Sequence, residues 1–452
     1  MPSASPIRRA PARLALALIA LALPAAAAPP PASSYVVVAK KSTLADPAWR
    51  EVVSALQAKH RATLASYETS VDEVLPPLQQ SFPRHTCFVT PPAEATRAFV
   101  SQVHQLTRQL DRDIYTDTQW GILTGYDAAD ALAIARESAP LIVNKVGAAT
   151  QFALDMVDEG LWYDELVPQK MVRKPKGQSP ETTQVPPDTT KALVDTLNQY
   201  RPDCFITSGH ATERDWQIGF AYPNGSFRSQ RGQLFGSDTQ NRRFDVASAN
   251  PKVYLAVGNC LMGHIDDREA MALAWMHSAG VRQMIGYTVT TWFGYAGWGC
   301  LDYFIEQPGR YTLAESFFAN HHALIHLLSQ APSPGLQHDR DVLAFYGDPK
   351  WEARLADRPK AWEQSLREDH GTYTFEIKPN RGPASFQPID TNGSQRGGRP
   401  FIAFFPQRLQ TAEIIRGADL QPVIADDFIL VPNPKACDPN RSYQVVFKAL
   451  PQ

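Results

Sequence analysis

Residues 204–210 read CFITSGH, a short apolar run that ends in a glycine and a histidine. Residues 253–260 read VYLAVGNC, a second apolar run, which ends in a cysteine. Continuous apolar runs of this length are typical of strands that are buried on both faces of a parallel sheet. In an open parallel sheet, reactive groups collect beyond the carboxyl ends of the strands. The two segments therefore predict a parallel sheet with His210 and Cys260 at its functional edge.

The pattern on both sides of these runs predicts an α/β fold with a largely parallel sheet, because short β-rich segments alternate with helical ones. Strands are expected at residues 35–39, 63–67, 86–89, 120–124, 141–145, 204–208, 253–257 and 281–287, and helices at 47–60, 93–110, 127–136, 189–200 and 268–278, with one more ending at Met156. Residues 164–188 lose this periodicity and predict a surface loop or joint.

The pattern changes past Pro359, where apolar residues alternate with polar ones, as in residues 372–377 and 443–447. Such alternation predicts a small antiparallel β domain of about 90 residues. We therefore expect an N-terminal α/β subdomain at 28–188, a catalytic α/β subdomain at 189–357 and a C-terminal β domain at 358–452.

The first 27 residues predict a secretory signal peptide. Arg8, Arg9 and Arg13 precede the apolar stretch 14–23, and the small residues 25–27 precede the expected cleavage after Ala27. The apolar stretch is too short to cross roughly 30 Å of hydrocarbon. We expect an exported protein, periplasmic or secreted, with no stable membrane insertion once the signal is removed.

Composition argues against a nucleic-acid partner. The chain has 44 Lys and Arg against 46 Asp and Glu, a formal net charge of −2. Binding to nucleic acid or an anionic membrane is driven by an excess of positive charge, which is missing here.

The five cysteines are Cys87, Cys204, Cys260, Cys300 and Cys437. An odd number in an exported protein leaves at least one thiol unpaired. Cys260 differs from the others because its strand-end position suits an accessible nucleophile. His210 at the neighbouring strand end can act as its base and later as the acid. The alternative interpretation is a buried core cysteine and an ordinary polar histidine.

Small residues surround the two reactive groups. Gly209 and Gly258 let the backbone approach a substrate closely, and backbone N–H groups at Gly209, Ala211 and Cys260 are candidates for an oxyanion hole. Neither a metal nor a cofactor is expected, and the expected partner is a polypeptide substrate.

Two motifs resemble those of the gingipain family of cysteine peptidases, whose caspase-like fold carries a His/Cys dyad on adjacent parallel strands. Residues 209–216, GHATERDW, are similar to the family's G-H-G-[ST]-E-x-x-W motif, and residues 260–263, CLMG, to its C-x-x-G motif. His210 also precedes Cys260 by about 50 residues, as in caspases. The resemblance implies a cysteine endopeptidase with an immunoglobulin-like domain after it.

The resemblance covers about residues 35–355 and is strongest over 189–355. It implies that Trp292 lines the specificity pocket and that Gly347-Asp348-Pro349 closes the catalytic domain. Ala211 stands where the family has a glycine, so its N–H suits the oxyanion hole only if the backbone there does not need a positive φ. The family's third carboxylate lies upstream of the histidine, where Asp155, Asp158 and Glu159 are the candidates.

Further side chains are candidates for substrate binding. Glu213 and Asp215 either orient His210, receive a basic side chain or are solvated loop charges. Trp216, Trp292 and Trp298 either wall a groove or belong to the core. An accessible carboxylate predicts preference for Lys or Arg before the cleaved bond, whereas a purely aromatic pocket predicts apolar side chains.

Three hypotheses for the function remain at this stage. The leading one is a secreted cysteine endopeptidase with Cys260 as nucleophile and His210 as base. A degenerate peptidase that binds peptides without cleaving them is the second, because of Ala211 and the unplaced carboxylate. The third is a metal site made of Cys260, His264 and His210, although one C-x-x-x-H spacing is a weak signal.

Overall fold

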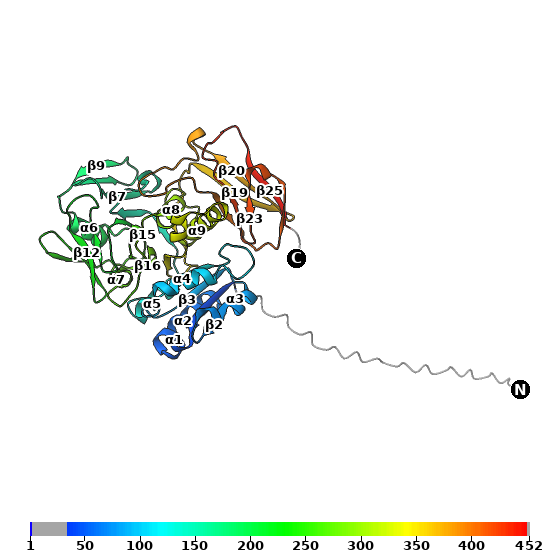
Figure 1. Ribbon diagram of the computed structural model, residues 1–452, viewed down its shortest axis with the longest axis horizontal. Coiled ribbons are helices and arrows are strands. Elements are labelled where there is room, and N and C mark those ends of the chain that lie inside the picture. The colour runs from blue at the N-terminus through cyan, green and yellow to red at the C-terminus, as the bar shows by residue number, and fades with distance from the viewer. Residues whose placement is uncertain (2–33, 450–452) are drawn as a thin grey trace. The chain divides into compact units, whose positions relative to one another are not determined.

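The central element of the fold is a mixed sheet of twelve strands (Figure 1). The structure is a computed structural model that describes Met1 and residues 34–449, so the predicted signal peptide lies outside the described residues. In sheet order the strands are β2 (Thr63–Tyr67), β1 (Tyr35–Lys40), β3 (His85–Val89), β4 (Gln119–Leu123), β17 (Leu343–Tyr346), β16 (Val281–Tyr287), β15 (Lys252–Asn259), β10 (Cys204–Gly209), β6 (Lys145–Ala148), β7 (Glu159–Tyr163), β8 (Lys170–Lys174) and β9 (Glu181–Gln184).

Most neighbouring strands in this sheet are parallel, as the apolar runs predict. The antiparallel pairs are β16 with β17, β7 with β8, and β8 with β9. Residues 253–257 of β15 are completely buried, as expected for a strand covered on both faces. The predicted α/β fold class is therefore confirmed.

Several helices, namely α2, α4, α5, α9 and α10, begin after a residue whose side chain caps them. Asp46 accepts a hydrogen bond from the Ala48 N–H, and Pro47 is the first residue of α2. The helices are α1 (Lys41–Ala45), α2 (Pro47–His60), α3 (Leu75–Ser81), α4 (Arg97–Leu106), α5 (Ala128–Arg136), α6 (Thr190–Asp195, continued by a π-turn, Thr196–Tyr200), α7 (Met271–Ser278), α8 (Tyr295–Phe304), α9 (Leu313–Gln330) and α10 (Pro334–Asp339). Short 3₁₀ turns lie at Val71–Val74, Leu154–Met156, Gly382–Ala384 and Ala418–Leu420.

The region between residues 141 and 188 differs from the prediction. The helix expected to end at Met156 is absent from the described chain, which instead forms β5 (Leu141–Val143), β6 and a 3₁₀ turn. The loop expected at 164–188 contains the hairpin of β8 and β9, which extends the main sheet. The boundary expected at 188 thus falls inside this sheet, because β6 on one side of it pairs with β10 on the other.

The polar segment between β10 and β15 forms a small sheet of its own. Its strands are β11 (Asp215–Gln217), β12 (Ser226–Gln230), β13 (Gln233–Ser237) and β14 (Arg243–Asp245), all antiparallel. In addition, β18 (Ala353–Leu355) pairs with β5.

The C-terminal region consists of two antiparallel sheets, as its period of two predicts. One contains β19 (Trp362–Asp369), β20 (Thr372–Pro379), β25 (Tyr443–Ala449) and β22 (Ala412–Arg416), and the other β21 (Phe401–Phe404), β24 (Phe428–Val431) and β23 (Val423–Ile424). Phe375 and Phe447 belong to its own core, whereas Ile402 and Phe428 join the core of the α/β part. The helices α8 and α9 lie between the main sheet and this β domain (Figure 1).

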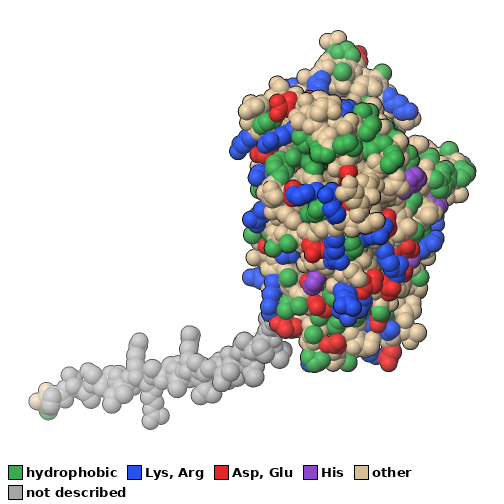
Figure 2. Space-filling model, turned by 90° about the vertical axis from the view of Figure 1, so that its left-hand side faces the viewer, with side chains coloured by type: hydrophobic (Ala, Val, Ile, Leu, Met, Phe, Trp, Pro, Cys, Tyr) green, Lys and Arg blue, Asp and Glu red, His purple; other side chains and the backbone are tan. Residues whose placement is uncertain are grey.

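Basic and acidic side chains lie interspersed on the face that Figure 2 shows, in agreement with the small net charge. None of the helices in the described part of the chain combines the length and the apolar composition that crossing a membrane requires.

Candidate active site

The ends of β10 and β15 bring the two predicted reactive residues side by side. The strands are parallel neighbours, with Gly209 paired to Asn259 at their carboxyl ends. His210 directly follows β10 and Cys260 directly follows β15, so both residues lie at the same edge of the sheet. This is the arrangement that the two apolar runs predict.

Asn259 holds the two strand ends together. Its side chain is completely buried, and its Nδ2 donates to the Gly209 carbonyl at 3.1 Å. Its Oδ1 accepts from the Thr207 hydroxyl at 2.6 Å, and Thr207 Oγ1 lies 2.8 Å from the Tyr254 hydroxyl. The residue before the candidate nucleophile therefore fixes the residue before the candidate base. The sequence analysis did not single out Asn259, although an amide at the end of an apolar strand is a detectable signal.

Cys260 is the partly exposed one of the five cysteines, all of which are free thiols. Burial raises the pKa of the other four thiols, which keeps them protonated and unreactive. The Thr291 N–H lies 3.3 Å from the Cys260 sulfur, where it can stabilise a thiolate. Its accessibility makes Cys260 the suitable nucleophile among the five.

The turn after Cys260 is strained. Leu261 has a φ of +56°, a conformation that residues with a Cβ adopt rarely. The loop after β16 holds this turn, because the N–H groups of Leu261 and Gly263 donate to Val289 and Tyr287 at 3.0 and 2.8 Å. Such strain is found at functional sites, where it presents a side chain away from the backbone.

His210 is exposed and its ring is held by an aromatic stack. The ring lies 4.6 Å from that of Phe220, at an angle of 26°. The Phe220 N–H donates to the Glu165 carbonyl at 2.7 Å, which fixes the stacking residue in turn. Within residues 34–449 no hydrogen bond joins the His210 ring to the Cys260 sulfur; bonds of this kind often form only when a substrate is bound.

The oxyanion candidates differ in their backbone. Gly209 has a φ of +107° and still belongs to the β10 ladder, whereas Ala211 is not among the described residues with positive φ. Ala211 faces Trp216 in an isolated bridge whose bonds use the N–H groups of Thr212 and Gln217. The N–H of Ala211 is outside this pairing, so the methyl group at 211 does not prevent it from donating.

A Gly209→Ala variant tests whether this backbone positions His210. An alanine at φ +107° is expected to cost about 1–2 kcal/mol of stability, although its Cβ would have room. The control is Gly177→Ala, which has a φ of +75°, is exposed and would meet no atom within 4 Å. Both variants should lose stability, but only Gly209→Ala should also slow the peptide hydrolysis that the sequence predicts; equal rates in the two variants would contradict the positioning role.

A cavity of about 320 Å³ opens beside the two reactive residues. Its lining includes Gly209, which precedes His210, Thr291, which contacts the Cys260 sulfur, and Phe220, which stacks on His210. Two other hollows, of about 480 and 530 Å³, are lined by none of these residues that adjoin or contact His210 and Cys260. The smaller cavity is therefore the one placed to receive a substrate side chain.

Glu165 lies in the wall of this cavity, two residues beyond the end of β7. It is 8% exposed; its Oε1 accepts from the Thr150 hydroxyl at 2.7 Å, and its buried Oε2 has no hydrogen-bond partner in the described chain. Burial raises the pKa of Glu165, while the polar side chains of Thr150, Ser208 and Asn392 around it oppose the rise. Of these three side chains, only Thr150 lies within hydrogen-bond geometry of the carboxylate in the described chain. A buried carboxylate in the wall of a cavity, with one oxygen that lacks a hydrogen-bond partner in the described chain, is suited to a cationic ligand.

Comparison with solved structures finds gingipain R. The crystal structure of the Arg-specific cysteine proteinase gingipain R (RgpB) is 10% identical, with a TM-score of 0.47 over 90% of this chain and 93% of that chain. The complex of the Porphyromonas gingivalis RgpB pro- and mature domains is 10% identical, with a TM-score of 0.45 over 92% and 93%. No protein-family model matches the chain, and no curated protein matches its sequence. These are similarities of overall fold at low sequence identity.

The carboxylates singled out in the sequence lie outside the cavity. Glu213 contacts His264 Nδ1 at 3.0 Å, and Asp215 pairs with Arg228 at 2.9 Å. Asp158 pairs with Arg358, Glu159 begins β7 at the opposite edge of the sheet, and Asp155 lies exposed in a 3₁₀ turn. The acid in the wall of the cavity beside His210 and Cys260 is Glu165 instead. Glu165 was not predicted from the sequence because β7, the strand before it, was not recognised.

The three tryptophans have different positions. Trp216 is completely buried and donates its indole N–H to the Ser208 carbonyl at 2.9 Å, so it supports the site from the core and does not line the cavity. Trp298 is 5% exposed and Trp292 63% exposed, and both line the cavity. Gly258 also lines it, and a Cβ there would lie 2.9 Å from Trp298, so this glycine makes room for the indole.

The residues of the third hypothesis do not form a metal site. Within residues 34–449, the groups of His, Cys and acidic side chains close enough to share an ion are His104 with His321 and Asp341, and Asp111 with Asp113 and Asp117. Cys260, His210 and His264 belong to neither group. His264 is engaged by Glu213.

The Gly347-Asp348-Pro349 turn is structural. Asp348 is completely buried, accepts from the Tyr35 hydroxyl at 2.8 Å and pairs with Lys59 at 2.9 Å. The turn therefore ties the end of β17 to β1 and α2 at a place remote from Cys260.

Proposed function

We propose that this protein is an exported cysteine endopeptidase with Cys260 as nucleophile and His210 as general base. The observation that carries the proposal is the placement of the partly exposed thiol and an exposed imidazole on adjacent strand ends, beside a cavity with a buried carboxylate. The pattern of residues 8–27 supports the location outside the cytoplasm.

Acylation of the enzyme uses both members of the dyad. His210 takes the thiol proton of Cys260 while the sulfur attacks the peptide carbonyl and forms a C–S bond. The N–H groups of Cys260 and Ala211 stabilise the oxyanion. The tetrahedral intermediate then collapses, the C–N bond breaks, and the His210 imidazolium gives its proton to the leaving amine.

Deacylation reverses these roles with water as the nucleophile. His210 takes a proton from the water that attacks the thioester, and the proton returns to the Cys260 sulfur when the C–S bond breaks. The strained turn at Leu261 and the Thr291 N–H keep the sulfur at the same place through both steps.

The cavity favours a basic side chain before the cleaved bond. Glu165 lies in its wall with Oε2 unpartnered, and the indole of Trp298 and the more exposed Trp292 also line it. A guanidinium or ammonium group can pair with the carboxylate, while its aliphatic part lies along the aromatic walls. We therefore expect a preference for Lys or Arg before the cleaved bond, with Glu165 as the carboxylate that pairs with the basic side chain.

Thiol labelling under native conditions tests the accessibility on which the proposal depends. Iodoacetamide is expected to alkylate Cys260 and to leave the four buried thiols unmodified until the protein is unfolded. Peptide mapping by mass spectrometry identifies the labelled site. Equal labelling of the five cysteines in the native protein would contradict the assignment.

Cleavage of a peptide library by the mature protein, beside its Cys260→Ala variant, tests the activity itself. Cleavage by the wild type and none by the variant is the expected result. A protein that binds library peptides without cleaving them would be the degenerate peptidase of the second hypothesis.

A further inference from the structure

One segment of the C-terminal β domain reaches the active-site cavity. Residues 389–399, here named the strap, connect β20 and the following 3₁₀ turn to β21. Their middle residues, Asn392, Gly393 and Ser394, line the cavity together with Glu165 and Trp298. One wall of the proposed substrate pocket therefore comes from a domain with a core of its own.

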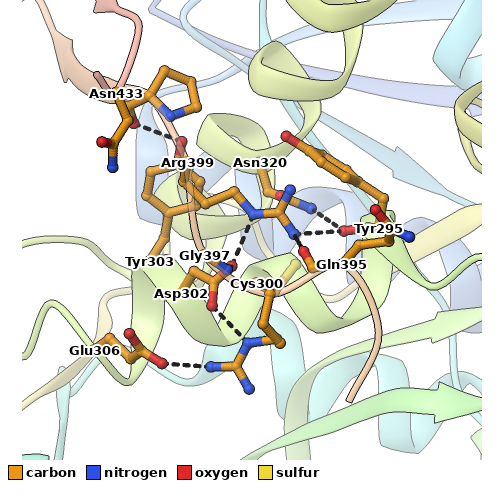
Figure 3. A network of polar contacts seen from close by, with 12 residues as sticks. Tyr295, Cys300, Asp302, Tyr303, Glu306, Asn320, Gln395, Gly397, Arg399 and Asn433 are labelled. Atoms are coloured by element: carbon orange, nitrogen blue, oxygen red, sulfur yellow. Dashed lines mark hydrogen bonds and ion pairs between the residues drawn. The ribbon is translucent and has the colours of Figure 1, made fainter. Parts of the chain in front are cut away.

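Buried ion pairs fix the strap to helix α8 and to the residues that directly follow it (Figure 3). Asp302 pairs with Arg396 Nε at 2.6 Å and with Arg399 Nε at 2.9 Å. Glu306 pairs with Arg396 Nη2 at 2.5 Å, and these four side chains are at most 6% exposed. Four buried charges that satisfy one another are costly to separate, so the strap is held in one place.

The start of the strap is anchored by Glu306, two residues beyond the end of the same helix. Glu306 also accepts from the N–H groups of Ile389 and Asp390 at 2.9 and 3.2 Å. Gly393 has a φ of +96°, and a Cβ there would lie 2.3 Å from the Trp298 ring. The backbone at 393 therefore lies directly on the cavity wall, where only glycine fits.

Asn392 connects the strap to the pocket carboxylate. Its Nδ2 donates to Thr150 Oγ1 at 3.0 Å and to the Gln151 carbonyl at 3.1 Å. Thr150 in turn donates its hydroxyl proton to Glu165 Oε1 at 2.7 Å. Because Asn392 occupies the acceptor side of the Thr150 hydroxyl, the proton of that hydroxyl is directed at Glu165.

We propose that the strap is part of the substrate site and that Asn392 is a positioning residue, which holds Glu165 through Thr150 for a cationic side chain. The inference rests on the proposed function. It gives the C-terminal domain a part in substrate selection, and a peptide with Arg before the cleaved bond is the ligand class that depends on it.

The test compares Asn392→Ala with Asn440→Ala, an exposed asparagine of the same domain. Two peptides are used that are identical except for Arg or Leu before the cleaved bond. For Asn392→Ala, KM for the Arg peptide is expected to rise about tenfold, with kcat changed less than about threefold. KM and kcat for the Leu peptide should each change less than about twofold. Asn440→Ala should leave KM and kcat for both peptides unchanged.

An equal change for both peptides, or none, would overturn the inference, because a merely structural role does not distinguish them. Binding of the same Arg peptide to the Cys260→Ala protein, with and without Asn392→Ala, repeats the test without hydrolysis. If the wild type cleaves nothing, the proposed function fails, and about tenfold weaker binding in the double variant still supports the inference. If Glu165→Gln weakens binding of the Arg peptide and Asn392→Ala does not, the inference fails and the proposed function stands.

Discussion

Replacement of Cys260 or of His210 by Ala is expected to lower kcat/KM for peptide hydrolysis by at least about 10⁴-fold. Each residue is needed for the same step, because the thiol is a weak nucleophile until the imidazole takes its proton. The double variant should therefore be no slower than either single variant. Initial rates on a peptide that the wild type cleaves give the three values.

The folded state should hardly change in these variants. Both side chains lie at strand ends and are at least partly exposed, so thermal midpoints are expected within about 2 °C of the wild type. Cys437→Ser and the exposed His370→Ala serve as controls that remove the same residue types elsewhere, and both should keep full activity. Residual activity of a tenth or more in Cys260→Ala would refute the assignment of the nucleophile.

The placement of His210 and Cys260 at neighbouring strand ends could be predicted from the sequence because it depends on local signals. An apolar run marks a buried parallel strand, and its carboxyl end marks the edge where reactive groups collect. His210 and Cys260 follow such runs, and the pairing of Gly209 with Asn259 brings them to neighbouring positions.

The pocket could not be predicted in the same way. Glu165 follows β7, whose five residues were not recognised as a strand beside the helix expected to end at Met156, so nothing marked the acid as a strand-end residue. Asn392 reaches Thr150 from a separate β domain, a contact of high sequence separation that no local pattern encodes. Trp216 was one of the candidates for the wall of the groove, but its burial against Phe227 puts it in the core.

The second large effect concerns Glu165. The Glu165→Gln variant keeps the shape of the side chain and removes its charge, and we expect kcat/KM for an Arg peptide to fall by about 10²–10³-fold, the cost of an unpaired buried cation. The kcat/KM for the Leu peptide should change less than about threefold, because the leucine side chain makes no ion pair. The matched control is Glu181→Gln, which replaces an exposed acid on β9. This variant should leave kcat/KM for both peptides unchanged.

The difference in melting temperature between the wild type and Glu165→Gln should depend on pH, because only the wild type carries a titrating carboxyl at this position. Burial raises the pKa of Glu165 in the folded protein, and the neighbouring Asp164 adds to the rise. The folded state therefore favours the protonated form, so the stabilising contribution of Glu165 is complete below its unfolded pKa and is lost as pH rises through the folded pKa. At pH 7–8 the ionised carboxylate destabilises the free enzyme, and Glu165→Gln should melt about 2–4 °C higher than the wild type. Near pH 4 the difference should disappear.

A variant that is less stable than the wild type at pH 8, with unchanged preference for Arg over Leu, would show that Glu165 is a structural acid and that the basic side chain is recognised elsewhere.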